Sequence, residues 1–444
     1  MPARTLDSSA IAVLCQDLTD VSEKPIDLVE DLCVENRNPV VDDTEWAYHK
    51  TKLVQINADG VKTAAQHILS KMANEVYTPR TWRTHPLHIL PPEPYDATAP
   101  LTKTVLDWIF LISSLNFSFW SEREGNPDRY GVEWQSAWVG EDAARREVFT
   151  GYWSLVAALN RAIADDGIPI TDPAFYSSET LCPDSVIENV FREAGESSEP
   201  IPLLKERIAV MREVGFILCN SFGGSYQGFL EEFQRRHDGC GTALDLVKMV
   251  TSTFPAFRDQ VLFEGRQVCV WKRAQILVAE TWAAFYPQLP SDASAPPPHP
   301  LFPGPRGASI GSLTMFADYR VPQILHHLRI LTYPPSLVSS LRAGTPLAPG
   351  SREELSLRAA SVVAVERVRA EMQRQREKAL RSSAGPERVG SVVRGVRDED
   401  EVSSVMIDFY LWDLAKRVES GEERIDGFDT AEMVPVHRTR SIWY

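Results

Sequence analysis

The amino-acid sequence predicts a mainly α-helical protein with at most a small β-hairpin element, and three observations support this fold class. Most of the patterned segments repeat their apolar residues with the 3.6-residue period of a helix. Residues typical of helix starts and helix ends flank several of these segments. Strand-like alternation is scarce, and its best candidate is the short stretch 261–271. With 43% apolar residues and 11 tryptophans, the chain can build a large core.

The first clear elements lie in the middle of the chain. Pro202 stands at a first helical position of PLLKERIAVMREVGFILCNSFGG, and the glycines follow its end, which is the usual asymmetry of helices. The next helix, TALDLVKMVTSTF, has Thr242 as its N-cap and stops before Pro255. Downstream, VLFEGRQVCVW alternates and turns at Glu264-Gly265, which indicates a hairpin.

Four further helices complete the predicted fold. WKRAQILVAETWAAF and VPQILHHLRIL both keep the helical period. SREELSLRAASVVAVERVRAEMQRQ opens with Ser351 and Glu354 at the spacing of a capping box. The last helix is VSSVMIDFYLWDLAKRV at residues 402–418, whose apolar face is interrupted by Asp408 and Asp413.

Composition marks three segments outside the expected core. Residues 1–45 are acidic and weakly patterned, so we expect an N-terminal extension there. Residues 288–309 are too rich in proline to be helical, and residues 381–401 are charged and punctuated by glycine. We expect the last two to be surface loops inserted into one domain that spans residues 46–444.

Charge and cysteine usage exclude several classes of protein. The formal net charge of −15 argues against a general affinity for nucleic acid, although a small anion can still bind in a local basic pocket. The six cysteines are scattered without a CxxC pair, as in reduced intracellular proteins. The N-terminus lacks a clear cleavage site, and the longest apolar run, VLDWIFLISSLNFSFW, is too short to span a membrane. We therefore expect a cytoplasmic protein with no membrane partner.

Motifs for metals and activated nucleophiles are weak. On a helix, the adjacent His326 and His327 point about 100° apart, which makes a poor chelating pair. His237 and Cys240 lack further spaced ligands. The glycine cluster at 221–228 follows a helix, whereas a phosphate cradle precedes one, so helix termination is the better interpretation. No GxSxG or zincin motif occurs, and we expect no metal site.

Two clusters of residues suit a small ligand. In TMFADYRVPQILHHL, Phe316 precedes Asp318 by two residues, directly before a predicted helix. The alternative is that Phe316 belongs to the core and Asp318 caps the helix. Arg258, Lys272 and Arg273 lie among aromatic residues and suit an anion; the alternative is a set of ordinary surface cations.

Asp408 and Asp413 are the most unusual residues of the last helix. Five positions apart, they lie roughly 140° apart around the helix axis and do not share one face. Both flank an aromatic stripe, so both can line the edges of one pocket. The alternative is that each forms a salt bridge with Arg or Lys elsewhere, because an unpaired buried charge is costly.

Several longer motifs occur together and in one order. They are LNFSFW (115–120), GYWSL (151–155), GIPIT (167–171), FPAFRD (254–259), LFEG (262–265), KRAQILVA (272–279), MFADYRVPQ (315–323), DFYLWD (408–413) and HRTRSIWY (437–444). This combination closely resembles the queuosine salvage family, from about residue 60 to the C-terminus. The resemblance implies a queuosine 5′-phosphate N-glycosylase/hydrolase with a mainly helical fold similar to that of DNA glycosylases. Residues 122–142 look peculiar to this chain, so we expect a third loop insertion there.

The resemblance also implies a base pocket. The pattern H-x-L-x-P selects His88 over His85, and the family often has Tyr where Phe409 stands. The implied pocket consists of His88, Phe316, Asp318, Asp408, Phe409 and Asp413.

The substrate that the family uses explains why carboxylates suit such a pocket. Queuine is a 7-deazaguanine whose edge offers N–H donors and whose aminomethyl arm is cationic, so carboxylates are its natural acceptors. Phe316 or Phe409 can provide a stacking platform. Cleavage builds positive charge on the ribose, and the resemblance favours Asp408 for its stabilisation, electrostatically or as a nucleophile. Asp318 and Asp413 then hold the base, and His88 contacts the base or the diol.

The implied substrate is a free mononucleotide with water as the second reactant, so no cofactor and no duplex nucleic acid are expected. Arg258, Lys272 and Arg273 are candidates for the phosphate site, from local charge alone. We expect a monomer. Two rivals stay open: a nucleic-acid base glycosylase, and a non-catalytic queuine-binding or tRNA-modification partner protein.

Overall fold

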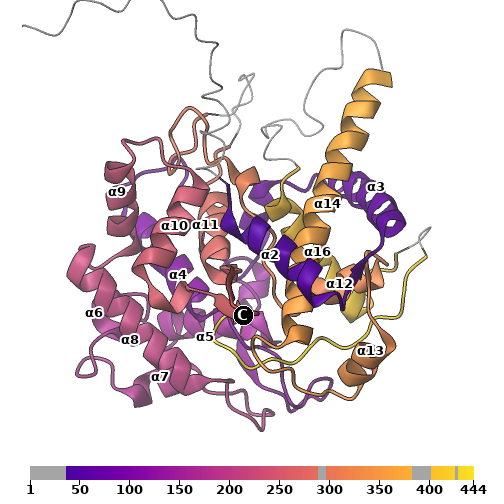
Figure 1. The fold of residues 1–444 in the computed structure, drawn as a ribbon. Coiled ribbons are helices and arrows are strands. Elements are labelled where there is room, and N and C mark those ends of the chain that lie inside the picture. The colour runs from indigo at the N-terminus through magenta and orange to yellow at the C-terminus, as the bar shows by residue number, and fades with distance from the viewer. Residues whose placement is uncertain (1–36, 289–296, 383–401, 426–428) are drawn as a thin grey trace, which may run out of the picture. The chain divides into compact units, whose positions relative to one another are not determined.

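The computed structural model describes residues 37–288, 297–382, 402–425 and 429–444 (Figure 1). The expectations for most of the N-terminal extension, for residues 289–296 and for residues 383–401 therefore fall outside the described residues. The compact unit runs from Asn38 to Tyr444.

The mainly helical fold class is confirmed. The longer helices are α2 (Pro39–Thr51), α3 (Ala58–Asn74), α4 (Pro100–Leu115), α5 (Tyr152–Ala164), α8 (Leu204–Ser221), α9 (Tyr226–Arg236), α10 (Ala243–Thr253), α11 (Lys272–Ala284), α14 (Arg352–Ser382) and α16 (Ser404–Ser420). Shorter ones are α6 (Pro173–Tyr176), α7 (Asp184–Val190), α12 (Val321–His327) and α13 (Pro335–Arg342), with 3₁₀ turns η1 (Pro79–Thr84), η2 (Glu141–Ala144), η3 (Pro255–Phe257) and η4 (Ile310–Ser312).

The strands of the described residues form three antiparallel pairs. The hairpin predicted from alternation is confirmed as β4 (Gln260–Phe263) and β5 (Arg266–Cys269), joined by Glu264 and Gly265. Both turn residues have positive φ, 46° and 80°, as the right-handed twist of a two-residue hairpin requires. The other pairs are β1 (Gln55–Ile56) with β6 (Leu331–Thr332) and β2 (Gly131–Gln135) with β3 (Arg146–Thr150).

Two predicted caps are present at the helix starts. Thr242 and Asp245 form a capping box at α10. Ser351 accepts a hydrogen bond from the Glu354 N–H at 3.3 Å, while the Glu354 carboxylate accepts from the N–H of Gly350 at 3.1 Å. The Ser351 cap is therefore confirmed, and Glu354 reaches one residue further back than a capping box has it.

Two segments belong to the packed structure although their sequences suggested otherwise. Helix α2 crosses the expected boundary at residue 45, and the Asn38 side chain that caps it also donates to Gln275 Oε1 of α11 at 3.0 Å. Within residues 122–142, β2 pairs with β3 and buries Val132 and Trp134 completely. That segment is therefore part of the core as well as part of a loop, because strand pairing turns its apolar residues inward.

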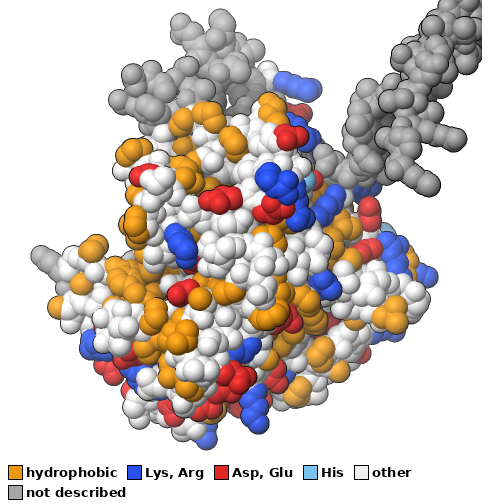
Figure 2. Space-filling view, turned by 90° about the vertical axis from the view of Figure 1, so that its left-hand side faces the viewer, with side chains coloured by type: hydrophobic (Ala, Val, Ile, Leu, Met, Phe, Trp, Pro, Cys, Tyr) orange, Lys and Arg blue, Asp and Glu red, His pale blue; other side chains and the backbone are white. Residues whose placement is uncertain are grey.

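The central helices are α4 and α11, which pack against each other. The residues of both helices are buried on almost every side, as expected for helices without a solvent face. Helix α16 packs on α12 and α14, and α14 packs on α2 and α3. Figure 1 shows the C-terminal end of the chain in the middle of the helices, where the Tyr444 carbonyl accepts a hydrogen bond from the Ser118 N–H at 2.9 Å. On the face drawn in Figure 2, Lys and Arg side chains are interspersed with Asp and Glu.

No helix within the described ranges combines the length and apolar character needed to cross a bilayer. The same residues contain no group of three or more His, Cys, Asp and Glu side chains that could hold a metal ion.

Candidate functional site

A cavity of about 290 Å³ lies between the helices. Its wall is formed by η1 and the loop after it, by the start of α5, by α11, by the loop before α12 and by α16. Although they come from three separate parts of the chain, all six residues of the expected base pocket line this cavity: His88, Phe316, Asp318, Asp408, Phe409 and Asp413.

Helix α16 provides two neighbouring stripes of the wall. Asp408, Trp412 and Lys416 are spaced by four residues, and Phe409 and Asp413 form a second pair with the same spacing. Residues four apart lie on one side of a helix, so both stripes face the cavity. The two aspartates thus line the same cavity from adjacent stripes, which is one of the two alternatives that their spacing left open.

Asp408 is buried and has little to compensate its charge. Its Oδ1 accepts a hydrogen bond from the Phe316 N–H at 2.9 Å, and no ion pair to it occurs among the described residues. Burial, reinforced by the charge of Asp318, raises the pKa of Asp408 well above the ordinary value, while Lys272 opposes this shift. The salt-bridge alternative is therefore not observed for Asp408.

Asp318 combines the two roles that its sequence left open. Its Oδ1 accepts hydrogen bonds from the N–H groups of Arg320 and Val321, both at 2.8 Å, at the start of α12. Asp318 therefore accepts N–H groups at the start of α12, although the N-cap position itself belongs to Arg320, and the same side chain also lines the cavity. Because the backbone bonds engage Oδ1, Oδ2 is the oxygen that they leave for a ligand.

Asp413 has a tyrosine as its partner. The Tyr77 hydroxyl donates to Asp413 Oδ2 at 2.6 Å. Burial raises the pKa of Asp413, and the Tyr77 hydrogen bond and the charge of Arg417 oppose this shift. Tyr77 itself lines the cavity, but no motif in the sequence distinguished it from a core tyrosine.

Both histidines of TWRTHPLHILPP line the cavity. His88 lies 2.7 Å from the Trp82 carbonyl through Nδ1, which must therefore carry the proton and leave Nε2 as an acceptor. His85 accepts the Leu87 N–H at Nδ1, so in the neutral ring its Nε2 carries the proton. Burial lowers the pKa of His88 to about 4 and that of His85 to about 3, so both rings are neutral at pH 7.

Helix α11 contributes an acid and a base that face the same space. Lys272, Ile276 and Glu280 form a stripe of the wall with a spacing of four residues. The Lys272 ammonium donates to the carbonyl and the side-chain oxygen of Asn116 at 3.1 and 3.0 Å. Burial lowers the pKa of Lys272 to about 8, against the pull of Asp318 and Asp408.

Glu280 was not predicted. Burial raises its pKa to about 7, and its one hydrogen bond among the described side chains is a long contact of 3.5 Å from the Tyr152 hydroxyl. The available signal was its position eight residues after Lys272 on a predicted helix, which places both on one face.

Two of the three cations proposed for phosphate lie elsewhere. Arg258 donates to the carbonyls of Thr251 and Ser252 at the end of α10, at 2.7 and 2.6 Å. Arg273 is fully buried, donates to backbone carbonyls and lies over the Phe117 and Phe257 rings. Both side chains are bonded to backbone carbonyls, and neither lines the cavity. Of the three cations, Lys272 alone lines it.

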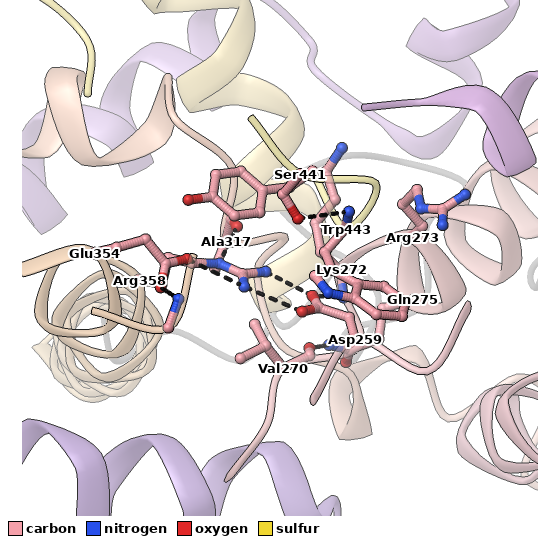
Figure 3. A network of polar contacts seen from close by, with 12 residues as sticks. Asp259, Val270, Lys272, Arg273, Gln275, Ala317, Glu354, Arg358, Ser441 and Trp443 are labelled. Atoms are coloured by element: carbon pink, nitrogen blue, oxygen red, sulfur yellow. Dashed lines mark hydrogen bonds and ion pairs between the residues drawn. The ribbon is translucent and has the colours of Figure 1, made fainter. Parts of the chain in front are cut away.

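A buried ion pair fixes two parts of the wall from behind (Figure 3). Arg358 of α14 donates to both oxygens of Asp259 at 3.1 and 2.5 Å. Asp259 also accepts the backbone N–H of Lys272 at 3.1 Å, and the Arg358 Nε donates to the Ala317 carbonyl at 2.9 Å. The start of α11 and the loop that carries Asp318 are thus held by the same pair.

Aromatic rings complete the lining. The Phe316 and Phe409 rings lie 5.9 Å apart at 55°, and Trp412 meets Tyr152 and Trp153 edge-on, also at 5.9 Å. A flat ligand can therefore contact aromatic faces and carboxylate edges at once.

Fold and site together define a mainly helical protein with a small-molecule cavity, suited to a flat ligand rich in N–H donors and to chemistry that develops positive charge. Comparison with known proteins agrees with this class. The family model described as queuosine salvage protein matches residues 96–444, so the chain belongs to that family and the resemblance seen in its motifs is confirmed.

Similar proteins occur in distant organisms. A Schizosaccharomyces pombe protein is 35% identical over 412 residues, covering 91% of this chain and 99% of its own. A Mus musculus protein is 34% identical over 88% of this chain and 94% of its own. A Sphaerobacter thermophilus protein is 31% identical over 92% and 98%. Each is named queuosine 5′-phosphate N-glycosylase/hydrolase.

Proposed function

We propose that this protein hydrolyses the N-glycosidic bond of queuosine 5′-phosphate and releases the base queuine. The observation that carries the proposal is the meeting of six residues from three parts of the chain in one cavity, three of them aspartates. Family membership and the names of the similar proteins support the same reaction.

Asp408 is the residue assigned to the bond-breaking step. As the bond from the anomeric carbon to the base nitrogen breaks, positive charge develops on the ribose. An ionised Asp408 beside that carbon stabilises the charge, through space or by a transient covalent bond. Water then supplies the new hydroxyl of the ribose, and one of its protons ends on the base nitrogen. Lys272 supports this role, because its positive charge favours the ionised form of Asp408.

The other carboxylates recognise the base. Asp318 Oδ2 and the second oxygen of Asp413 are acceptors that suit the N–H groups of a guanine-like edge or the cationic amine. Stacking on Phe316 or Phe409 adds about 1–3 kcal/mol by analogy with other base-binding proteins. The Nε2 of His88 suits a hydroxyl of the diol, because it is the unprotonated nitrogen of that ring.

We also propose that the enzyme is a cytoplasmic monomer whose product feeds tRNA modification. The four cysteines among the described residues are free, which supports a reducing compartment. One chain supplies every residue assigned above, so the reaction needs no second copy.

The test is base release, measured by chromatography, from queuosine 5′-phosphate, queuosine and guanosine monophosphate with added chelator. We expect queuine to appear fastest from the first substrate, with guanosine monophosphate inert. Tight queuine binding without release from any of the three would instead indicate a binding protein.

A further inference from the structure

The phosphate of a nucleotide needs a cationic partner, and few cations reach the cavity. Among the described residues that line it, the permanently or partly charged cations are Lys272, Arg320 and Lys416. His85 and His88 line it too, but both are neutral at pH 7. The choice of a phosphate partner is thus between α11 on one side and the α12–α16 side on the other.

Lys272 is a poor partner for an anion. Two of its three N–H donors already bind Asn116, and Asp318 and Asp408 both act on its charge. Glu280 feels the same ammonium from the same helix. A doubly charged phosphate at Lys272 would lie among three carboxylates, which repel it.

Arg320 and Lys416 form a different environment. They share one carboxylate, Glu419, at 2.9 Å from Arg320 and 3.6 Å from Lys416. Burial, together with repulsion by the positive charge of Arg320, lowers the pKa of Lys416 to about 8. Arg129 and Glu124 also act on this lysine but pair with each other. Asp318 also acts on the charge of Arg320, but Glu419 is the one carboxylate among the described residues that lies within 4.0 Å of either cation, so positive charge is in local excess.

The donors of Lys416 are available. Its ammonium lies 5.8 Å from the Trp412 ring, and no hydrogen bond of 3.5 Å or less to it is found in the described parts of the chain. Glu419 is the most exposed member of the group, with 43% of its side chain exposed against 8% for Arg320 and 30% for Lys416. An incoming phosphate can take its place beside both cations.

Helix α16 orders these groups along the cavity. Asp408, Trp412 and Lys416 follow one another at intervals of four residues, so the backbone positions of Asp408 and Lys416 are about 12 Å apart along the helix axis. Because helical side chains lean toward the N-terminus, the Lys416 side chain reaches back toward Asp408, and its ammonium lies 5.8 Å from the centroid of the Trp412 ring. A nucleotide whose ribose lies at Asp408 can extend its phosphate along this helix toward Lys416, because both residues line the same cavity.

We propose that Arg320 and Lys416 form an anion subsite that binds the 5′-phosphate of the nucleotide. This inference rests on the proposed function and adds the residues that select a nucleotide over a nucleoside. Glu419 occupies the subsite in the free protein and is displaced by the phosphate.

The test combines a change in the protein with a change in the substrate. Lys416→Met should lower kcat/KM for queuosine 5′-phosphate by about 10–100-fold, because a charge-assisted bond is lost. The same variant should change kcat/KM for queuosine, which has no phosphate, by about threefold or less. Lys205→Met, at an exposed position of α8, is the matched control and should change neither. Equal losses for both substrates, or no loss for either, would overturn the subsite.

Binding without turnover keeps the test independent of the reaction. Ribose 5-phosphate binding to the wild type, measured by calorimetry, should weaken about tenfold or more in Lys416→Met. It should tighten in Glu419→Gln, which removes the competing carboxylate. Unchanged binding in both variants would refute the subsite even if the wild type releases queuine, whereas failure of base release alone refutes only the reaction.

Discussion

Two regions of this protein bury charged side chains to the same depth, but one region pairs its charges and the other leaves them unpaired. Behind the cavity, Arg358 and Asp259 are 4% and 3% exposed and form a bidentate ion pair with further backbone bonds. In the cavity wall, Asp408 is 4% exposed and has one backbone hydrogen bond. We infer that the paired charges hold the cavity walls in place, and that the unpaired carboxylates are available to bind a ligand.

Removing one partner of the buried pair should have the largest effect on stability. Arg358→Met leaves Asp259 buried without its partner, so we expect the free energy of unfolding to fall by about 3–5 kcal/mol. Urea unfolding measures this directly. Arg367→Met is the control on the same helix, because its ion pair with Glu45 is 44% exposed on both sides and should contribute about 1 kcal/mol or less. Similar losses in the two variants would show that the pair behind the cavity is not special.

Replacing the cavity acid Glu280 should change how the stability of the protein depends on pH. Its pKa is raised from 4.5 to about 7, so its contribution to stability is full below pH 4.5 and is lost as pH rises through 7. Glu280→Gln removes this dependence. Relative to wild type, its unfolding free energy should therefore increase by on the order of 2–3 kcal/mol between pH 4.5 and pH 8. Urea unfolding at both pH values tests this, with the exposed Glu188→Gln as control. Stability curves that run parallel to wild type would contradict the assignment.

The pH dependence of kcat/KM should report the same unpaired groups. Asp408 has a raised pKa and must be ionised, so activity is lost on acidification at a pH above the ordinary aspartate range. Lys272 has a pKa of about 8 and must be charged, so activity falls about tenfold per unit above that pH. With queuosine as substrate, which has no phosphate for Lys416 to bind, the alkaline limb should vanish in Lys272→Met and the acidic limb should move upward. If the alkaline limb stays in place, another group produces it.

The smallest effect is expected at the aromatic platform. Phe409→Tyr keeps the ring and adds the hydroxyl common in the family, so kcat/KM should change by about threefold or less. Phe409→Ala removes the ring and should lower kcat/KM by about 10–100-fold, corresponding to about 1–3 kcal/mol of stacking. Steady-state kinetics of base release compares the two. If both variants behave alike, Phe316 is the platform instead.

Local rules explain what could be predicted from the sequence. The Thr242 cap, the turn at Glu264-Gly265 and the helical period depend on neighbouring residues, and all appear in the structure. The six pocket residues came from motifs, whose order along the chain carries the resemblance. Those motifs identify residues without giving their contacts.

Tertiary packing decides the rest. Arg273 looked like a cation for an anion site, but it is fully buried and donates to backbone carbonyls. Tyr77 became a site residue only through the contact of its hydroxyl with Asp413, distant in sequence. The strand β2 could not be predicted within the segment expected to be a loop insertion, because its partner β3 lies beyond an intervening turn.

The most direct test of the account is to measure base release and stability together for Asp408→Asn, a change that removes a charge with almost no change in volume. If the buried carboxylate is kept for chemistry, kcat/KM for queuosine 5′-phosphate should fall by about 10²–10³-fold or more. The free energy of unfolding should be equal to or higher than that of the wild type, because the variant no longer buries an unpaired charge. A variant that turns over like the wild type, or one that loses activity only because it unfolds, would contradict the account.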